Sequence, residues 1–240
     1  AGKTTTIKVL MNLIEPTGGQ ARVLGVDSRR LTPRERRKIG YVSENQKMPD
    51  WMTVDQLLRY CRPFYPTWDR DLEARLMRQF ELPPDRKLGQ LSRGMWMKTA
   101  LLSSLAYRPK LLVLDEPFSG LDPLVRDEFI QGTLELSQQE EWTIFISSHD
   151  INEVEQLADW VGIIDAGRLN LAEPIAQLQG RFRRIEVTAG GEHFPMGNLP
   201  ETWLEVERED SFVRAVESRY SEDRLEEYRH GPLADVEFAV

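Results

Sequence analysis

The chain has 240 residues and a mass of 27.8 kDa, enough for one large domain or two small ones. Charged residues make up 29% and hydrophobic residues 40%, and no apolar run approaches the ~18 residues that a membrane-spanning helix needs. The single cysteine, Cys61, excludes an intramolecular disulfide and a zinc site built from cysteines. The net charge of −8 weighs against a dedicated DNA-binding protein, although basic residues are concentrated before residue 111.

Short apolar runs and helical patterns alternate along most of the chain. The runs that predict strands are 21–26, 39–44, 111–115, 143–147 and 160–165. The patterns that predict helices are 53–62, 69–81, 94–107, 123–138 and 152–158. This alternation predicts an α/β fold, and the uninterrupted apolar runs at 111–115 and 143–147 predict parallel strands buried on both faces.

The pattern changes near residue 178. Beyond it, strand-like runs at 184–187, 202–207 and 235–240 surround one predicted helix at 221–229. We therefore predict two domains. The first, 1–178, contains a helical subdomain at about 53–108, and the second, 179–240, is a small α+β appendage.

A partial phosphate-binding motif lies at the start of the sequence. Gly2-Lys3-Thr4-Thr5 matches the last part of G-x-x-x-x-G-K-[ST], in which backbone N–H groups and a helix N-terminus bind phosphates. Lys3 is predicted to reach the β- and γ-phosphates, and the Thr4 hydroxyl to bind Mg²⁺. A match this short is common by chance, so it needs a second motif for support.

The run 111–117 is that second motif. Four apolar residues lead into Asp115-Glu116, which predicts a buried strand with two carboxylates at its end. Asp115 would lie beside the phosphate loop and hold Mg²⁺ through water, and Glu116 would act as general base on the attacking water. Standing alone, the run would better fit a core strand that ends in solvated acids.

Three further segments complete the pattern. They are Leu91-Ser92-Arg93-Gly94-Met95, then Ser119-Gly120-Leu121-Asp122, and Ser147-Ser148-His149-Asp150. Taken in order, GKTT, LSRGM, LLVLDEP, SGLD and SSHD resemble the motifs of the ATP-binding subunit of an ATP-binding-cassette (ABC) transporter, over about residues 1–176.

The resemblance implies a P-loop NTPase cassette with a mostly parallel sheet, which binds ATP and Mg²⁺ and hydrolyses ATP. It also implies that two such subunits bind ATP between them. Ser92, Gly94 and Asp122 would then contact the ATP or the interface of the second subunit, and His149 would contact the γ-phosphate. The ATP-binding residues expected within one subunit are Gly2, Lys3, Thr4 and Thr5.

Three positions depart from the family pattern. Arg93 replaces the first glycine and Met95 the glutamine of L-S-G-G-Q, in a signature that resembles those of bacterial exporters of drugs, antibiotics or lipid-like compounds. Where the family has a Mg²⁺-binding glutamine, this chain has Glu44, with Gln46 two residues later. A carboxylate suits Mg²⁺, whereas Gln46 would need a shifted loop, so Glu44 is favoured. The alternative for both is a solvated loop residue.

The first half of the phosphate loop, the strand before it and an aromatic residue that would stack on adenine are absent from the sequence. We therefore expect a chain truncated at its N-terminus within the loop, which binds nucleotide poorly. The alternative is that the chain as given is inactive.

The leading hypothesis is an ATPase subunit that powers an ABC exporter. The resemblance implies a transmembrane permease subunit and a second ATP-binding subunit as partners, no nucleic acid, and a cytoplasmic location on the inner face of the plasma membrane. One alternative is a regulatory or assembly module that docks a partner without hydrolysing ATP. Another is an ABC ATPase of DNA repair or translation, which 240 residues disfavour because those proteins carry a long insertion or a second cassette.

Overall fold

The computed structural model describes residues 2–139, 142–189, 199–208, 212–230 and 236–239. The chain divides into two compact units, Ala1–Leu157 with Ile164–Arg168, and Ala158–Ile163 with Leu169–Val240. The domain boundary expected at residue 178 stays a prediction. Among the described residues, no helix combines the length and apolar character needed to span a membrane.

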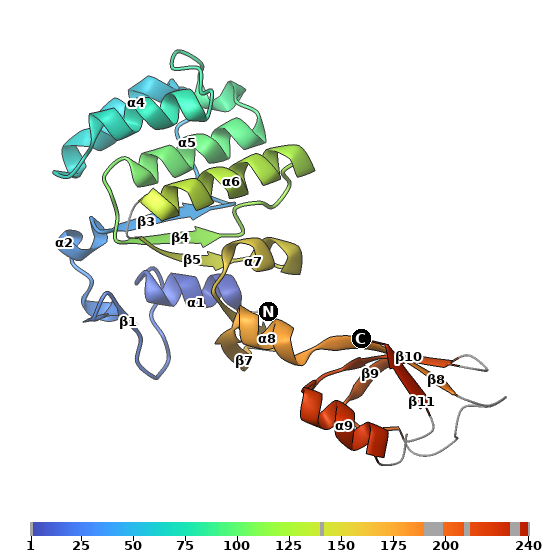
Figure 1. Ribbon diagram of the computed structural model, residues 1–240. Helices are drawn as coiled ribbons and strands as arrows, with labels where there is room; N and C mark the ends of the chain where they lie inside the picture. Colours follow the sequence, from blue (N-terminus) through green and yellow to red (C-terminus); the bar gives the residue numbers. More distant parts are fainter. Residues whose placement is uncertain (1, 140–141, 190–198, 209–211, 231–235, 240) are drawn as a thin grey trace. The chain divides into compact units, whose positions relative to one another are not determined.

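A parallel sheet of three strands is the centre of the first unit (Figure 1). The strand order is β3 (Ile39–Ser43), β4 (Leu111–Asp115) and β5 (Thr143–Ser147). Asp115 is in register with Ser43 on one side and with Ser147 on the other. The carboxyl ends of all three strands therefore lie at one edge, which is where parallel α/β sheets bind ligands.

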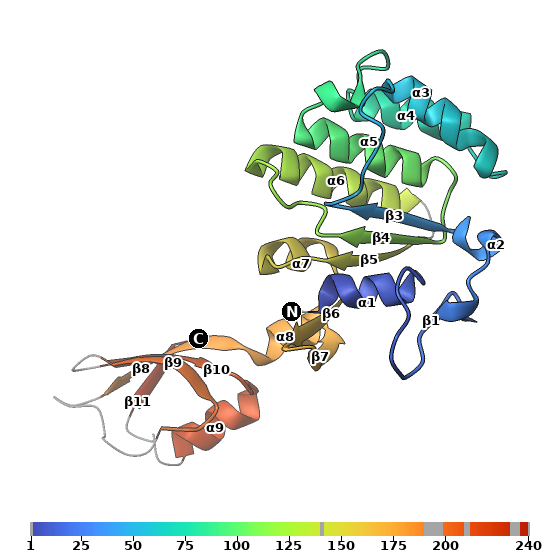
Figure 2. The same ribbon diagram turned by 180° about the vertical axis from the view of Figure 1, so that it is seen from behind.

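Helices cover both faces of this sheet, as the two opposite views show (Figures 1 and 2). Because side chains alternate along a strand, Leu112 and Leu114 belong to the core that includes residues of α5 (Arg93–Leu105) and α6 (Pro123–Gln139). Ile39 and Val113 belong to a second core with Ile7 of α1 (Lys3–Leu10). The predicted α/β fold with a parallel sheet is confirmed.

The connection between β3 and β4 is helical apart from one isolated bridge, Thr53 to Lys87. It contains α3 (Val54–Cys61), α4 (Arg70–Gln79) and α5, with short 3-10 turns at Arg62–Phe64 and Leu88–Gln90. Side chains of Thr53, Asp69 and Ser92 cap the three helices at their N-termini by accepting backbone N–H groups.

Two strand predictions were wrong in detail. The run 21–26 is a hairpin of β1 (Arg22–Val23) and β2 (Val26–Asp27), because Leu24 and Gly25 both have positive φ and turn the chain back. The strand β5 is not buried on both faces, and Phe145 is 42% exposed. Within the described residues β5 pairs only with β4.

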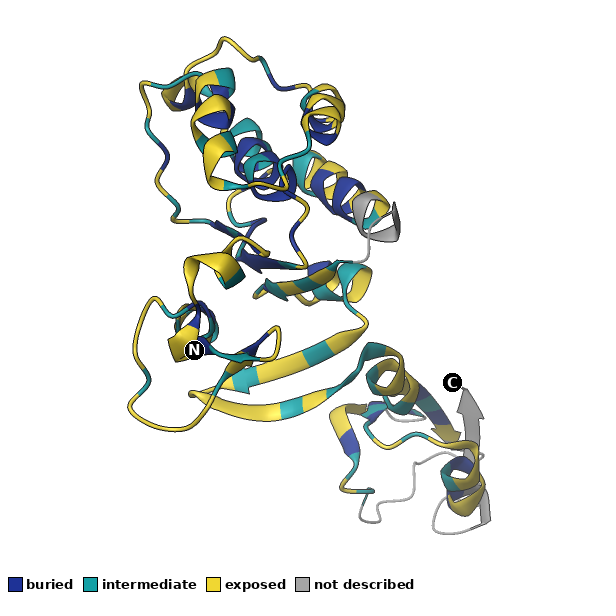
Figure 3. Ribbon diagram, turned by 90° about the vertical axis from the view of Figure 1, so that its left-hand side faces the viewer, coloured by how far each residue is buried: buried dark blue, intermediate teal, exposed yellow. Residues whose placement is uncertain are grey.

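Short elements connect these strands and helices. The 3-10 turn Ser28–Arg30 and α2 (Pro33–Arg36) precede β3, and α7 (Ile151–Leu157) follows β5. A hairpin of β6 (Trp160–Asp165) and β7 (Arg168–Pro174) forms a two-stranded sheet of its own, and its residues are mostly exposed (Figure 3).

The second unit contains α8 (Ile175–Arg181) and an antiparallel sheet packed on one helix. The strand order is β11 (Val236–Ala239), β8 (Arg183–Ala189), β10 (Phe212–Glu217) and β9 (Trp203–Arg208), and the helix is α9 (Glu222–His230). The buried side chains of Ile185, Trp203 and Tyr228 are part of its core.

Candidate active site

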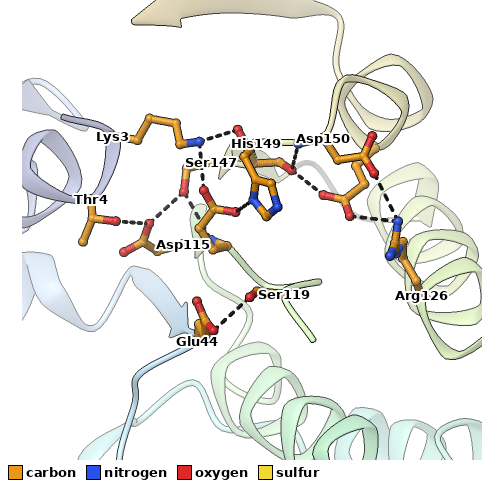
Figure 4. Close-up of polar contacts among 12 residues, drawn as sticks. Lys3, Thr4, Glu44, Asp115, Ser119, Arg126, Ser147, His149 and Asp150 are labelled. Carbon is orange, nitrogen blue, oxygen red and sulfur yellow. Dashed lines mark hydrogen bonds and ion pairs between the residues drawn. The ribbon is translucent and has the colours of Figure 1, made fainter. Parts of the chain in front are cut away.

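Asp115 is a buried carboxylate at the carboxyl end of β4, with only 2% of the residue exposed. Its Oδ1 accepts hydrogen bonds from the Thr4 hydroxyl at 3.0 Å and from the Ser147 hydroxyl at 2.7 Å (Figure 4). Thr4 and Asp115, which the sequence predicts to bind the same ion, therefore meet although 111 residues separate them.

Glu116 adopts an unusual backbone conformation, with φ of 51°. A non-glycine residue in this left-handed region carries a cost of about 1–2 kcal/mol. Its N–H donates to Ser147, to the carbonyl oxygen at 3.1 Å and to the hydroxyl at 3.2 Å. These bonds support the strained backbone, and strain of this kind clusters at functional sites.

The Glu116 carboxylate contacts side chains from the start of α1 and from the segment that follows β5. Its Oε1 lies 2.9 Å from Lys3 Nζ, and its Oε2 lies 2.8 Å from His149 Nδ1. Lys3 Nζ also donates to the Ser148 carbonyl oxygen at 2.7 Å. The predicted general base, Glu116, thus contacts both the predicted phosphate-binding lysine and the predicted histidine.

The same contacts shift two pKa values. Partial burial raises the pKa of the Glu116 carboxyl, but hydrogen bonds from Lys3 and His149 outweigh it, so the pKa lies below the ordinary 4.5. The hydrogen bond and the negative charge of Glu116 hold the pKa of His149 above the ordinary 6.5. Both shifts favour the charged pair.

The His149–Glu116 pair is expected to make its full contribution to the free energy of unfolding between pH 4.5 and 6.5. This contribution is lost as the pH falls through the lowered pKa of Glu116 and as it rises through the raised pKa of His149. We expect an NMR titration of the His149 ring to give a pKa above 6.5, and Glu116→Gln to move it back towards 6.5. The His149→Gln variant identifies the resonance, and an unchanged midpoint in Glu116→Gln would contradict the pairing.

The start of α1 leaves backbone N–H groups for a ligand. The first helical hydrogen bond runs from Thr6 N–H to the Gly2 carbonyl, so the N–H groups of Lys3, Thr4 and Thr5 precede it. Gly2 has φ of 119° and caps the helix without a side chain. Such an end attracts anions, because the free N–H groups and the helix dipole act together.

The donor set at Thr4 and Asp115 fits Mg²⁺. Both side chains offer oxygen, and Mg²⁺ is commonly bound by one or two carboxylates together with substrate phosphates and water. Within the described residues, no group of three or more His, Cys, Asp or Glu side chains is arranged to hold a metal without such help.

Glu44 follows β3, and its N–H donates to the Asp115 carbonyl oxygen at 3.1 Å. Its carboxylate accepts a hydrogen bond from the Ser119 hydroxyl at 2.8 Å (Figure 4). The same carboxylate pairs with Arg93 at 3.0 Å. Gln46, the other candidate, has a buried side-chain oxygen that finds no hydrogen-bond partner among the described residues.

Ser92, Gly94 and Asp122 form a separate group at the starts of α5 and α6. The Ser92 hydroxyl accepts from Met95 N–H at 3.3 Å, and Asp122 Oδ1 accepts from Val125 N–H at 3.1 Å. A Cβ at Gly94 would lie 2.6 Å from Val125, so close helix packing requires glycine there. Within the part of the chain described, no hydrogen bond joins this group to Lys3 or Glu116.

Ser147 and Arg126 support the site but were not predicted from the sequence. Ser147 holds both Asp115 and Glu116, and only the register between β4 and β5 reveals this. Arg126 pairs with Asp150 at 3.2 Å and with Glu153 at 3.5 Å, and the Ser148 hydroxyl donates to Glu153. These contacts hold the loop that carries His149.

The sequence and the fold are similar to those of known proteins. The sequence profile described as "ABC transporter" matches residues 1–119. The bacitracin transport ATP-binding protein BcrA of Bacillus licheniformis is 34% identical over 77% of this chain and 61% of its own length. The molybdenum import ATP-binding protein ModC of Rhodobacter capsulatus is 33% identical over 74% of this chain and 50% of its own length.

A solved structure described as the ATP-binding subunit of an ABC transporter superposes with a TM-score of 0.65. It is 26% identical and covers 74% of this chain and 76% of its own. The chain spans one half to about three fifths of the two curated relatives. The resemblance carried by the five motifs is confirmed, and the chain belongs to the family of ABC transporter ATP-binding domains.

Proposed function

We propose that this chain binds ATP with Mg²⁺ and hydrolyses it, as the ATP-binding subunit of an ABC transporter. The observation that carries the proposal is the meeting of Lys3, Thr4, Asp115, Glu116 and His149 at the carboxyl end of the parallel sheet. This cluster combines a cation for phosphates, oxygen donors for a metal ion and a carboxylate positioned to accept a proton.

Phosphate binding is assigned to Gly2, Lys3, Thr4 and Thr5. The free N–H groups at the start of α1 would donate to phosphate oxygens, and Lys3 Nζ would reach the β- and γ-phosphates. Lys3 must then exchange its 2.9 Å contact with Glu116 for a phosphate oxygen. This exchange removes one of the hydrogen bonds that lower the pKa of Glu116, and a higher pKa makes the carboxylate a stronger base.

Mg²⁺ binding is assigned to the Thr4 hydroxyl and the Asp115 carboxylate. When bound, Mg²⁺ neutralises charge that develops on the phosphate oxygens during transfer. Glu44 is the favoured further oxygen ligand rather than Gln46. The support for this choice is the hydrogen bond from Glu44 N–H to the Asp115 carbonyl oxygen, which makes the two positions neighbours.

Glu116 and His149 are the proposed catalytic residues. Glu116 would accept a proton from water as the water oxygen attacks the γ-phosphorus, while the bond between that phosphorus and the oxygen of ADP breaks. His149 would donate a hydrogen bond to the γ-phosphate. The support for this assignment is the 2.8 Å contact between His149 Nδ1 and Glu116 Oε2, which makes the two side chains neighbours.

Ser92, Gly94 and Asp122 are proposed to face a second ATP-binding subunit. Their position at the starts of α5 and α6, apart from the Lys3 cluster, supports a role toward the partner's ATP. A transmembrane permease subunit is the other proposed partner, and it would hold this chain at the inner face of the plasma membrane. Nucleic acid is not a proposed partner.

Export is the proposed direction of transport. The support is the LSRGM signature, together with a relative named for bacitracin transport and a probable multidrug ABC transporter ATP-binding protein, YbhF of Escherichia coli. The relative named for molybdenum import, ModC, is 33% identical to this chain, close to the 34% of BcrA. ATP-dependent uptake of a drug by inside-out membrane vesicles that contain this chain and its permease would support export, whereas uptake by right-side-out vesicles would contradict it.

Phosphate release by the purified chain tests the central proposal. We expect release that requires both ATP and Mg²⁺ and that EDTA abolishes. A fluorescent ATP analogue measures binding separately from turnover. Binding without turnover would contradict the assignment as an ATPase and would favour a regulatory module, and neither binding nor turnover at millimolar ATP would contradict the proposal as a whole.

A further inference from the structure

Arg93 joins three segments that are distant in the sequence. Its guanidinium Nη2 lies 3.0 Å from Glu44 Oε1, and its Nε donates to the Ser119 carbonyl oxygen at 2.7 Å. The Ser119 hydroxyl donates to the same Glu44 oxygen at 2.8 Å. The first turn of α5, the residue after β3 and the turn that precedes α6 are thereby closed into one hydrogen-bonded network.

The shape of the turn at Gly120 matches the position of Arg93. Gly120 has φ of 68°, and a Cβ added there would lie 2.9 Å from Arg93 Nε and 3.2 Å from its Cζ. The guanidinium therefore lies directly against the glycine backbone. A side chain at position 120 would strain the turn and displace Arg93.

Two backbone hydrogen bonds connect this network to the candidate active site. Glu44 N–H donates to the Asp115 carbonyl oxygen at 3.1 Å, and Ser119 N–H donates to the Glu116 carbonyl oxygen at 3.3 Å. Three carboxylates, those of Glu44, Asp115 and Glu116, thus occupy neighbouring segments. Lys3 pairs with Glu116, and Arg93 pairs with Glu44.

We propose that Arg93 is a positioning residue, which holds the Glu44 carboxylate and the Ser119–Gly120 turn in place and offsets the charge of Glu44 beside the Mg²⁺ site. Arg93 and Glu44 are the two charged departures from the family pattern, and the structure pairs them with each other. The structural part stands on these contacts alone, while its consequence for Mg²⁺ rests on the proposed function.

Hydrogen exchange without ligand tests the structural part. In Arg93→Ala we expect the amides of Ser119 and Leu121 to exchange about threefold to fivefold faster, the scale of a lost, partly exposed ion pair. Arg93→Ala should raise these exchange rates less when Glu44→Gln is already present, because both substitutions break the Arg93–Glu44 ion pair. Arg93→Lys should give an intermediate effect, since lysine keeps the charge and loses the planar fork.

Lys98→Ala is the matched control for this exchange experiment. Lys98 lies on the same helix and pairs with Glu128 of α6 at 2.9 Å, and in the described structure it forms no hydrogen bond or ion pair with the Ser119–Gly120 turn. The proposal would be overturned if the amides of Ser119 and Leu121 exchanged at the same rate in Arg93→Ala and in Lys98→Ala. It would also be overturned if the effects of Arg93→Ala and Glu44→Gln on these rates were strictly additive.

The Mg²⁺ dependence of ATP hydrolysis tests the consequence. Without Arg93 the uncompensated Glu44 attracts cations more strongly, so the half-saturating Mg²⁺ concentration should fall about threefold while kcat also falls. Adding Glu44→Gln should return the half-saturating Mg²⁺ concentration to its wild-type value, but it should not restore kcat. An unchanged or raised Mg²⁺ requirement in Arg93→Ala would overturn this consequence. A wild-type chain without ATPase activity would instead contradict the proposed function, and the exchange result would still decide the structural part.

Discussion

Replacing Glu116 with glutamine is expected to lower the rate of ATP hydrolysis by about 10²–10⁴-fold, the usual contribution of a general base, while ATP still binds. Glutamine has the size of glutamate and keeps a carbonyl oxygen for Lys3, but it cannot take a proton from water. The contacts at 2.9 Å to Lys3 and 2.8 Å to His149 show that the carboxylate itself occupies the centre of the site.

The measurement is phosphate release at saturating Mg²⁺ and ATP, paired with binding of a fluorescent ATP analogue. Glu128→Gln is the matched control, because Glu128 lies on α6, is about half exposed and pairs with Lys98 outside the site. Hydrolysis at the wild-type rate in Glu116→Gln would remove Glu116 from the role of base. Loss of hydrolysis in the control as well would point to a general loss of structure.

Replacing Lys3 with alanine is expected to weaken ATP binding by about 10- to 100-fold, the factor that corresponds to ~1.5–3 kcal/mol for a hydrogen bond to a charged group. Lys3 is a cation in direct contact with Glu116, and its removal also takes away a hydrogen bond that lowers the pKa of that carboxyl. The pKa of Glu116 should therefore rise towards its ordinary value or above it.

Isothermal titration with ATP measures this loss, and Lys8→Ala is its control. Lys8 lies on the same helix, is exposed and has the same charge, so it reports any general electrostatic effect. If both variants lose affinity equally, the contribution of Lys3 is a general effect of charge rather than direct contact with phosphate. The pKa change can be followed separately through the chemical shift of the Glu116 carboxyl carbon.

Much of the first unit can be predicted from local patterns. The apolar run 111–115 became β4, the GKTT segment begins α1, and each predicted helix between 53 and 158 is present within a few residues. Local patterns are sufficient there because burial on the sheet and capping by Thr53, Asp69 and Ser92 agree with the helical periodicity. The strand β10 and helix α8 were not predicted.

Two errors have a physical cause that lies beyond local sequence. A continuous apolar run such as 143–147 indicates burial, but burial depends on what packs beside the strand, and Phe145 of β5 is half exposed in the described structure. At 21–26 the positive φ of Leu24 reverses the chain, although leucine seldom adopts this conformation.

The sequence by itself determined the family, because five motifs in a set order and spacing leave few alternatives, and it named Lys3, Thr4, Asp115, Glu116 and His149. Only the tertiary structure decided what Arg93 does. Its contact with Glu44 spans 49 positions in the chain, and the contact with Ser119 spans 26. Pairings at such separations are set by the packing of α5 against the sheet and not by neighbouring residues. For the same reason, Ser147 became part of the site only when β4 and β5 were placed in register.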